Sequence, residues 1–395
     1  MIPISSIFHN LKNSTWFWFW NNRNGVTPLF LAFSVILVCA WYFIKPKRTT
    51  PPLPPGPRGI PILGNLLSLD PELHSYFADL GRTYGPILKI RLGTKIGIVV
   101  SSPSIARQVL KDQDTTFANR DMPAVAAPVT YGGLDIAWTP YGPQWRMLRK
   151  VCALKMLSNT TLDSVYALRR REIRQTVAYT YTRVGSPVNV GEQIFLTILN
   201  VITNMMWGGT VEGDERASLG AEFRELISDI TELLGKPNIS DFFPGLAPFD
   251  LQGMLKKMRG LSRRFDGIFE KMIDQRLKIN NESSNGKKQS QDFLQFLINL
   301  KDEGGDSKTP FTMTHLKALL MDMVVGGSDT SSNTIEFVMA EIMNNPEVTK
   351  RAQQELAEVV GQKLDVSEKF GIVLKKKTPL VAIPTPRLSS PALYE

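Results

Sequence analysis

One apolar run near the N-terminus limits what this chain can fold into more than any other feature. Val26 to Ile44 carries no charged side chain, and at about 1.5 Å per helical residue it can cross a bilayer core of about 30 Å. Lys45, Lys47 and Arg48 follow at once, which predicts one transmembrane helix with the rest of the chain in the cytosol. The alternative is a cleaved signal peptide, but we find neither the short apolar core nor the small-residue cleavage site that it has.

Beyond the apolar run, the patterns predict a mainly helical body with small β pieces. Pro51 to Pro57 is proline-rich, which favours a stiff extended hinge. Ile87 to Arg91 and Gly97 to Ser101 predict a short β-hairpin, and strand patterns return only near the end, in Phe370 to Leu374 and Leu380 to Ile383.

Seven segments have apolar residues at helical spacing. They are Trp145 to Leu157, Leu162 to Tyr181, Ile194 to Trp207, Phe223 to Leu234, Met254 to Leu277, Phe293 to Leu300 and Thr314 to Met343. We therefore divide the chain into five parts. These are an N-terminal segment (1–25), an anchor (26–44), a basic stop and hinge (45–60), a helical domain (61–361), and that domain's C-terminal hairpin and tail (362–395).

Composition excludes several function classes. Lys and Arg number 46 against 37 Asp and Glu, a net charge of +9. This excess is spread along the chain, which suits an anionic membrane surface or an acidic protein and argues against nucleic acid. Cys39 and Cys152 cannot form a disulfide framework, and His9, His74 and His315 share no metal-ligand spacing. We therefore expect neither a zinc enzyme nor a non-haem iron enzyme.

The last long helical segment contains an unfavourable stretch, Gly326-Gly327-Ser328-Asp329-Thr330. Each glycine inside a helix costs about 1 kcal/mol relative to alanine. Two explanations fit the pattern. The small residues allow close helix packing, or the helix opens locally and presents a carboxylate beside a hydroxyl to a ligand.

These features resemble, in their order along the chain, a plant microsomal cytochrome P450. The amino-acid sequence from Phe117 to Arg174 and that of the tail are similar to the plant P450 family that contains sesquiterpene hydroxylases such as δ-cadinene 8-hydroxylase. The segments that carry the resemblance are the anchor, the Pro-rich hinge, Phe117 to Arg120, Trp145-x-x-x-Arg149, Gly326 to Thr330, Phe370 to Val373 and Pro379-Leu380. The implied fold is mainly α with small β-sheets, preceded by the transmembrane helix.

The resemblance also implies roles for individual residues around haem b. Asp329 and Thr330 would be the catalytic acid and alcohol that relay protons to dioxygen, and Gly326 and Gly327 would form the floor of the oxygen pocket. Trp145 and Arg149 would hold a haem propionate; a plain amphipathic helix with an inner Trp and a solvated Arg is the alternative. The residues expected to line the apolar substrate pocket are Met122, Val125, Leu134, Phe242, Leu320 and Val324.

The thiolate that such an enzyme needs on its haem iron does not occur in this sequence. No Phe-x-x-Gly-x-Arg-x-Cys-x-Gly loop and no Glu-x-x-Arg pair are found. Cys39 lies in the anchor, and Cys152 is better explained as a small buried side chain. The chain passes from the helical Glu355 to Gly361 directly to Leu364 to Phe370. We interpret this junction as the loss of an internal block, through a skipped exon or a mis-joined gene model.

Three hypotheses follow. The first is a P450 monooxygenase of the endoplasmic reticulum membrane that hydroxylates an apolar, terpenoid substrate with electrons from NADPH-cytochrome P450 reductase, although this chain lacks the means to bind haem as a thiolate complex. The second is a catalytically silent, membrane-anchored product that binds ligand or reductase. The third, a helical binding protein outside the family, would make the combined motifs a coincidence.

Overall fold

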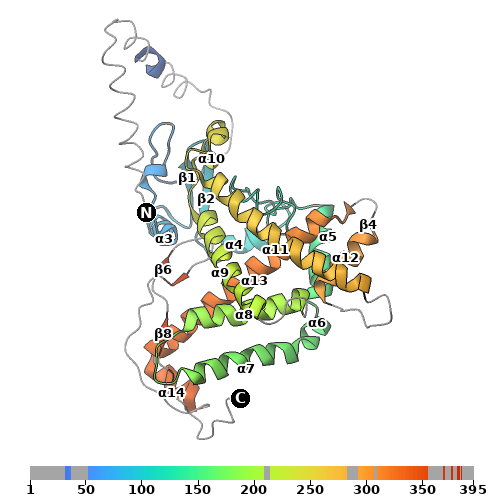
Figure 1. Cartoon of the computed structure of the whole chain (residues 1–395). Helices are drawn as coiled ribbons and strands as arrows, with labels where there is room; N and C mark the ends of the chain where they lie inside the picture. Colours follow the sequence, from blue (N-terminus) through green and yellow to red (C-terminus); the bar gives the residue numbers. More distant parts are fainter. Residues whose placement is uncertain are drawn as a thin grey trace, which may run out of the picture.

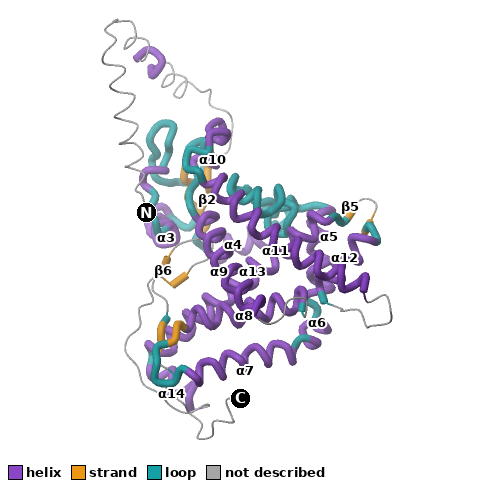
Figure 2. The backbone as a smooth tube through the Cα atoms, in the orientation of Figure 1, coloured by secondary structure: helices purple, strands orange, loops and turns teal. Residues whose placement is uncertain are grey.

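The computed structural model of the chain describes residues 32–36, 52–208, 214–282, 292–306, 309–354, 368–369, 375–376, 380–382 and 384. Helices dominate this part, and the strands are short and lie at its edges (Figure 2). The long helices gather around α13 (Met313–Asn344), which crosses the centre of the molecule in Figure 1.

Helices form in all seven predicted segments. The main helices are α5 (Pro143–Val151), α7 (Tyr166–Thr182), α8 (Val190–Trp207), α9 (Asp214–Gly235), α11 (Met254–Glu282), α12 (Phe293–Asp302) and α13. Six of the segments bury apolar side chains in the core, whereas α7 buries only Glu172 and exposes Ile173 and Val177. Shorter helices are α3 (Leu73–Tyr84), α4 (Pro103–Arg107), α6 (Asn159–Ser164), α10 (Ile239–Phe242) and α14 (Pro346–Gln354). The helix α5 continues through one π-helical turn, η3 (Cys152–Met156).

Side-chain caps fix where several of these helices begin. Asn189, Asp292 and Thr312 accept backbone N–H groups at the starts of α8, α12 and α13, respectively. Each cap satisfies one of the donors that the first helical turn leaves without a partner. In α13 the His315 side chain also bonds back to the Thr312 amide, which completes a capping box.

The predicted hairpin is confirmed as β1 (Ile87–Leu92) and β2 (Lys95–Val100), which pair antiparallel with Leu92 opposite Lys95. Near the C-terminus, β8 (Val381–Ala382) pairs antiparallel with β3 (Val188–Asn189) just before α8. Two more small pairs join β4 (Gly305–Asp306) to β5 (Thr309–Pro310) and β6 (Glu368–Lys369) to β7 (Lys375–Lys376). The expected strand at 370–374 lies outside the described residues.

An aromatic cluster joins three helices in the core. Trp207 of α8 stacks on Phe223 of α9 at 6.0 Å between ring centroids, and Phe265 and Phe269 of α11 contact Phe223 at 5.3 and 6.4 Å. All four side chains are buried. Burial of such large rings is the dominant stabilising contribution in a helical core.

Most of the predicted membrane anchor lies outside the described residues, which include only 32–36 of that run, as a short helical segment. Within the described residues, no helix is both long enough and apolar enough to cross a membrane. The predicted span from Val26 to Ile44 therefore stays a prediction.

Candidate functional site

The α13 helix is regular at its glycine pair. Helical structure runs unbroken from Met313 to Asn344, so the local opening that the sequence left as one explanation is not formed. A Cβ on Gly327 would lie 2.7 Å from Ile202 Cδ1 of α8, whereas a Cβ on Gly326 would meet no described residue beyond its own helix backbone within 4 Å. Gly327 therefore permits close packing of α13 on α8, and Gly326 faces open space.

Asp329 and Thr330 are neighbours in sequence but have different surroundings. Asp329 is buried, and its Oδ1 accepts a hydrogen bond of 3.1 Å from Asn333 Nδ2. Thr330 is exposed, and its hydroxyl donates to the Gly326 carbonyl at 2.7 Å. The acid thus lies inside the protein and the alcohol lies on its surface.

Thr330 belongs to a stripe of exposed residues along α13, which we call the α13 outer stripe. Its members are spaced by four positions, as residues on one helix face are: Gly326, Thr330, Thr334 and Val338. Val338 is 50% exposed although it is apolar. The Thr334 hydroxyl, like that of Thr330, donates to a carbonyl of its own helix, at 2.9 Å.

The two predicted propionate-binding residues both lie on α5, but their surroundings differ. The Trp145 indole N–H donates to the Ile136 carbonyl at 3.0 Å, so this donor is used within the chain. Arg149 is exposed, and its guanidinium forms no ion pair with the part of the chain that the structure describes. Arg149 is therefore available to an anion, whereas Trp145 fixes the loop that precedes α5.

Cys152 does not offer a metal-binding thiolate. It is 1% exposed, in η3, within the main apolar core. Burial and then the nearby Asp322 carboxyl raise the pKa of its thiol to about 12, although Arg149 acts in the opposite direction. Among the described residues there is also no cluster of three His, Cys, Asp or Glu side chains able to hold a metal ion.

These observations test whether the described residues fit a haem. The exposed Arg149 suits a carboxylate, but Trp145 is engaged elsewhere, and the thiol of Cys152 is neutral and enclosed by apolar side chains. A haem with a thiolate ligand needs an ionised sulfur facing the iron. The described residues therefore do not fit a thiolate-bound haem.

The expected substrate-pocket residues fall into two groups. Val125, Leu320 and Val324 are fully buried in the main core, where the loop before α5 meets α13. Met122 lies in the same loop, with its sulfur 3.7 Å from the Thr130 hydroxyl, and Leu134 is half-buried at the end of that loop.

Phe242 lies apart from these residues, at the turn of the β1–β2 hairpin. Its carbonyl accepts hydrogen bonds from the Thr94 amide and hydroxyl at 3.0 and 2.9 Å. The connection to the loop is made one residue earlier, where the Asp241 carboxylate accepts the Ala124 amide at 2.7 Å. The structure thus brings α10 to the edge of the loop that carries Met122 and Val125.

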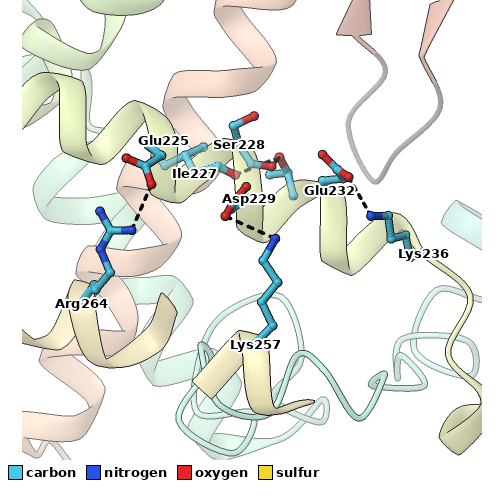
Figure 3. A network of polar contacts seen from close by, with 9 residues as sticks. Glu225, Ile227, Ser228, Asp229, Glu232, Lys236, Lys257 and Arg264 are labelled. Carbon is cyan, nitrogen blue, oxygen red and sulfur yellow. Dashed lines mark hydrogen bonds and ion pairs between the residues drawn. The ribbon is translucent and has the colours of Figure 1, made fainter. Parts of the chain in front are cut away.

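Ion pairs join α9 to α11 on the outer side of the aromatic core (Figure 3). Arg264 binds Glu225 at 3.1 Å, and Lys257 binds Asp229 at 3.4 Å. These side chains are 36 to 64% exposed, so each pair contributes at most about 1 kcal/mol. The pairs orient the two helices, while the aromatic core supplies most of the stability.

Two polar contacts between the loop and the helices were not predicted from the sequence. Tyr131 donates to Asp266 of α11 at 2.8 Å, and Asp266 also binds Lys317 of α13. The Ile136 amide, next to the buried Asp135, donates to Asp322 Oδ2 of α13 at 2.7 Å. The one available signal was an aspartate inside the apolar run Leu319 to Val325.

Comparison with known proteins gives a consistent result. A family model for cytochrome P450 matches residues 54–369. A flavonoid 3'-monooxygenase from Crocosmia x crocosmiiflora is 36% identical over 351 residues, which cover 87% of this chain and 68% of that protein. Costunolide synthase from Lactuca sativa is 34% identical over 339 residues, covering 85% of this chain and 66% of that protein.

A solved zebra fish cytochrome P450, described with progesterone, is similar in fold. It has a TM-score of 0.58 and 20% sequence identity, and the match covers 73% of this chain and 64% of that one. This likeness supports the helical fold alone. The chain spans about two thirds of the length of the relatives that it matches.

Proposed function

The chain belongs to the cytochrome P450 family, and from this premise we propose that it is the substrate-side part of a monooxygenase, unable by itself to form the haem-thiolate centre. Haem, where a P450 binds it, supplies the activation of dioxygen. The flavonoid relative is a monooxygenase by name, and we propose the same reaction class, with electrons from an NADPH-dependent reductase, for a form of this protein that carries the thiolate loop.

The observation that carries this proposal is the state of Cys152. The sequence has two cysteines, and Cys39 falls in the predicted anchor. Cys152 is enclosed by the core, and its thiol stays protonated far above neutral pH. A sulfur in this state cannot serve as the thiolate ligand.

The test is the carbon monoxide difference spectrum of the reduced, purified chain after incubation with haem. We expect no Soret band at the position of thiolate-bound haem, and the same result for Cys152→Ser. The matched positive control carries a thiolate-loop block from the Crocosmia relative between Gly361 and Leu364, and we expect that band to form there. A thiolate band in the unmodified chain would contradict the proposal, and its loss in Cys152→Ser would identify the ligand.

We propose that the residues expected to line the substrate pocket bind an apolar, terpenoid substrate. Val125, Leu320 and Val324 are apolar and belong to the same core cluster, and an apolar lining suits a hydrocarbon. Costunolide synthase among the relatives favours a terpenoid, while the flavonoid monooxygenase favours a planar phenolic compound. Thermal shifts of the purified chain with a sesquiterpene hydrocarbon and with a flavanone, at equal concentrations, distinguish the two classes.

A second candidate is a silent, membrane-anchored product that binds an acidic protein such as the reductase. One specific observation favours it: α7 carries exposed Arg170, Arg171 and Arg174 on one side of the helix. Acidic partners bind such surfaces in a salt-dependent manner. Binding of the chain to immobilised reductase should weaken as salt rises and should weaken further in an Arg170→Glu, Arg174→Glu variant. Salt-independent binding, unchanged in the variant, would exclude this surface.

A further inference from the structure

The last described residues of the chain return to the start of α8 as an extended strand. This strand, β8, pairs antiparallel with β3. Main-chain bonds continue on both sides of β8: the Val190 amide donates to the Leu380 carbonyl at 2.7 Å, and the Gly185 amide donates to the Pro384 carbonyl at 3.1 Å. We call residues 380–382 and 384 the C-terminal strap.

A buried carboxyl group of α13 holds the C-terminal strap from another side. Glu336 is 7% exposed, and its Oε1 accepts the Leu380 amide at 2.6 Å. The two main-chain groups of Leu380 are therefore bound by two helices, the carbonyl by α8 and the amide by α13. A carboxylate accepts an N–H group more strongly than a neutral oxygen does. Since a carboxylate is costly to bury without a donor, the bond stabilises Glu336 and the strap together.

The room for this carboxyl group comes from a glycine in the first turn of α8. A Cβ on Gly191 would lie 2.7 Å from Glu336 Oε1, which is too close for two non-bonded atoms. Any side chain at this position would therefore push the carboxyl group away from the Leu380 amide. The start of a helix also favours a negative charge, because its first amides carry a partial positive charge.

One side chain of the C-terminal strap enters a small apolar core. Leu380 is 2% exposed and forms a cluster with Val190 and Ala340 that is separate from the main core. The next side chain, that of Val381, is 50% exposed, as expected for a strand whose side chains alternate between two faces. A peptide that adds to a strand is recognised in this way, since main-chain bonds give affinity and pockets for alternate side chains give specificity.

We propose that the junction of β3, α8 and α13 is a binding site for an extended peptide, and that its occupant is the chain's own C-terminal strap. In this site Glu336 and Gly191 recognise the main chain of the strap, and the small apolar core recognises Leu380. We call this junction the strap site. The proposal depends neither on haem nor on monooxygenase activity.

The test empties the strap site and offers the strap as a separate molecule. In the full-length Leu380→Asp variant, purified in detergent, a charge replaces the buried leucine, so the strap should leave the site. The probe is a fluorescein-labelled peptide with the sequence of residues 377–388, and fluorescence anisotropy measures its binding. We expect saturable binding to Leu380→Asp. The wild-type chain should bind the peptide about 100-fold more weakly, because its own strap competes at a high effective concentration.

Variants of the site, made in the Leu380→Asp background, show whether the peptide binds where we propose. Glu336→Ala removes the acceptor of the strap amide and should weaken binding by about 10- to 100-fold. Gly191→Ala should also weaken binding, because its Cβ displaces the carboxyl group. The matched control is Glu341→Gln, an exposed carboxyl change on the same helix, which should leave binding unchanged. A peptide that carries Leu380→Asp should not bind.

Hydrogen exchange gives a second measurement that keeps the native strap. In Gly191→Ala, made in the otherwise wild-type chain, the strap amides should exchange at least about tenfold faster than in wild type. The amides of α11 should exchange at the wild-type rate in every variant, which shows that the chain stays folded.

Four results would overturn the proposal. The first is no binding of the peptide to Leu380→Asp while α11 stays protected, and the second is equal binding with and without Glu336→Ala. The third is unchanged strap exchange in Gly191→Ala. The fourth is a wild-type chain that elutes as a dimer in size-exclusion chromatography and becomes a monomer in Leu380→Asp, because the strap would then occupy the site of a second copy.

Discussion

The buried contact between Arg276 and Asp292 allows a prediction that separates two roles of one side chain. Arg276 of α11 and Asp292 are 3% and 9% exposed and form an ion pair. Asp292 also caps α12, since its Oδ1 accepts the Gln295 amide at 3.0 Å. Arg276 donates a further bond to the Trp207 carbonyl at 3.2 Å. The pair thus joins α11, α12 and the end of α8.

The expected energies follow from these contacts. Asp292→Asn keeps an oxygen for the cap but removes the carboxylate charge that pairs with the buried Arg276 guanidinium, which costs about 3 to 5 kcal/mol. Asp292→Ala also loses the cap, which adds about 1 kcal/mol. In the double variant Arg276→Leu, Asp292→Asn no charge is left buried, so its loss should be well below the sum of the two single losses.

Urea unfolding, followed by tryptophan fluorescence, measures these differences as shifts in the midpoint. The purified full-length chain in detergent is the sample, and Glu341→Gln on α13 is the control that should leave the midpoint unchanged. If Asp292→Asn unfolds at the wild-type midpoint, the buried pair does not stabilise the fold. If the double variant loses the full sum of the single losses, the two charges do not act on each other.

Three further predictions concern α13, the anchor and pH. Gly327→Ala should destabilise the chain by about 1 to 3 kcal/mol because the new Cβ meets Ile202. Gly326→Ala should be neutral or stabilising by up to about 1 kcal/mol. Equal effects of the two variants in thermal unfolding would contradict the packing that we describe. Deletion of residues 1–45 should move most of the chain from the membrane pellet to the soluble fraction, and retention in the pellet at high salt without aggregation would show that another segment binds the membrane. Folding raises the pKa of the Asp322 carboxyl to about 8, so the folded chain keeps a proton that the unfolded chain releases above about pH 4. The free energy of unfolding of the wild type should therefore fall relative to that of Asp322→Asn as pH rises from about 4 to about 8, by at most about 1.4 kcal/mol per pH unit. Parallel unfolding curves of the two proteins across this range would refute that linkage.

The sequence predicts well where the helices lie, but it predicts poorly which distant residues they contact. Helices such as α8 and α11 are recognisable because their buried residues recur at helical spacing, which is a local property of the chain. The hairpin β1–β2 is local for the same reason. By contrast, the amide of Ile136 binds Asp322 across 186 positions, and no pattern within one segment indicates that the two will meet.

The glycine pair shows the same limit within a single helix. Both residues are equally unfavourable in helix propensity, so the sequence cannot say which of them packs and which faces open space. The neighbour at Ile202 decides this for Gly327, and it comes from another helix. Asp329 and Thr330 are likewise found as a motif from the sequence, but only the structure shows that one is buried and the other exposed.

The α13 outer stripe has a consequence for how long this protein would survive in a cell. A central helix that exposes Gly326, Thr330, Thr334 and Val338 along one face is open to proteases on that face whenever it unfolds locally. At an equal rate of synthesis, faster degradation would lower the steady-state amount of the chain. A pulse-chase comparison with a thiolate-loop-bearing form would show this as a shorter half-life at equal rates of translation.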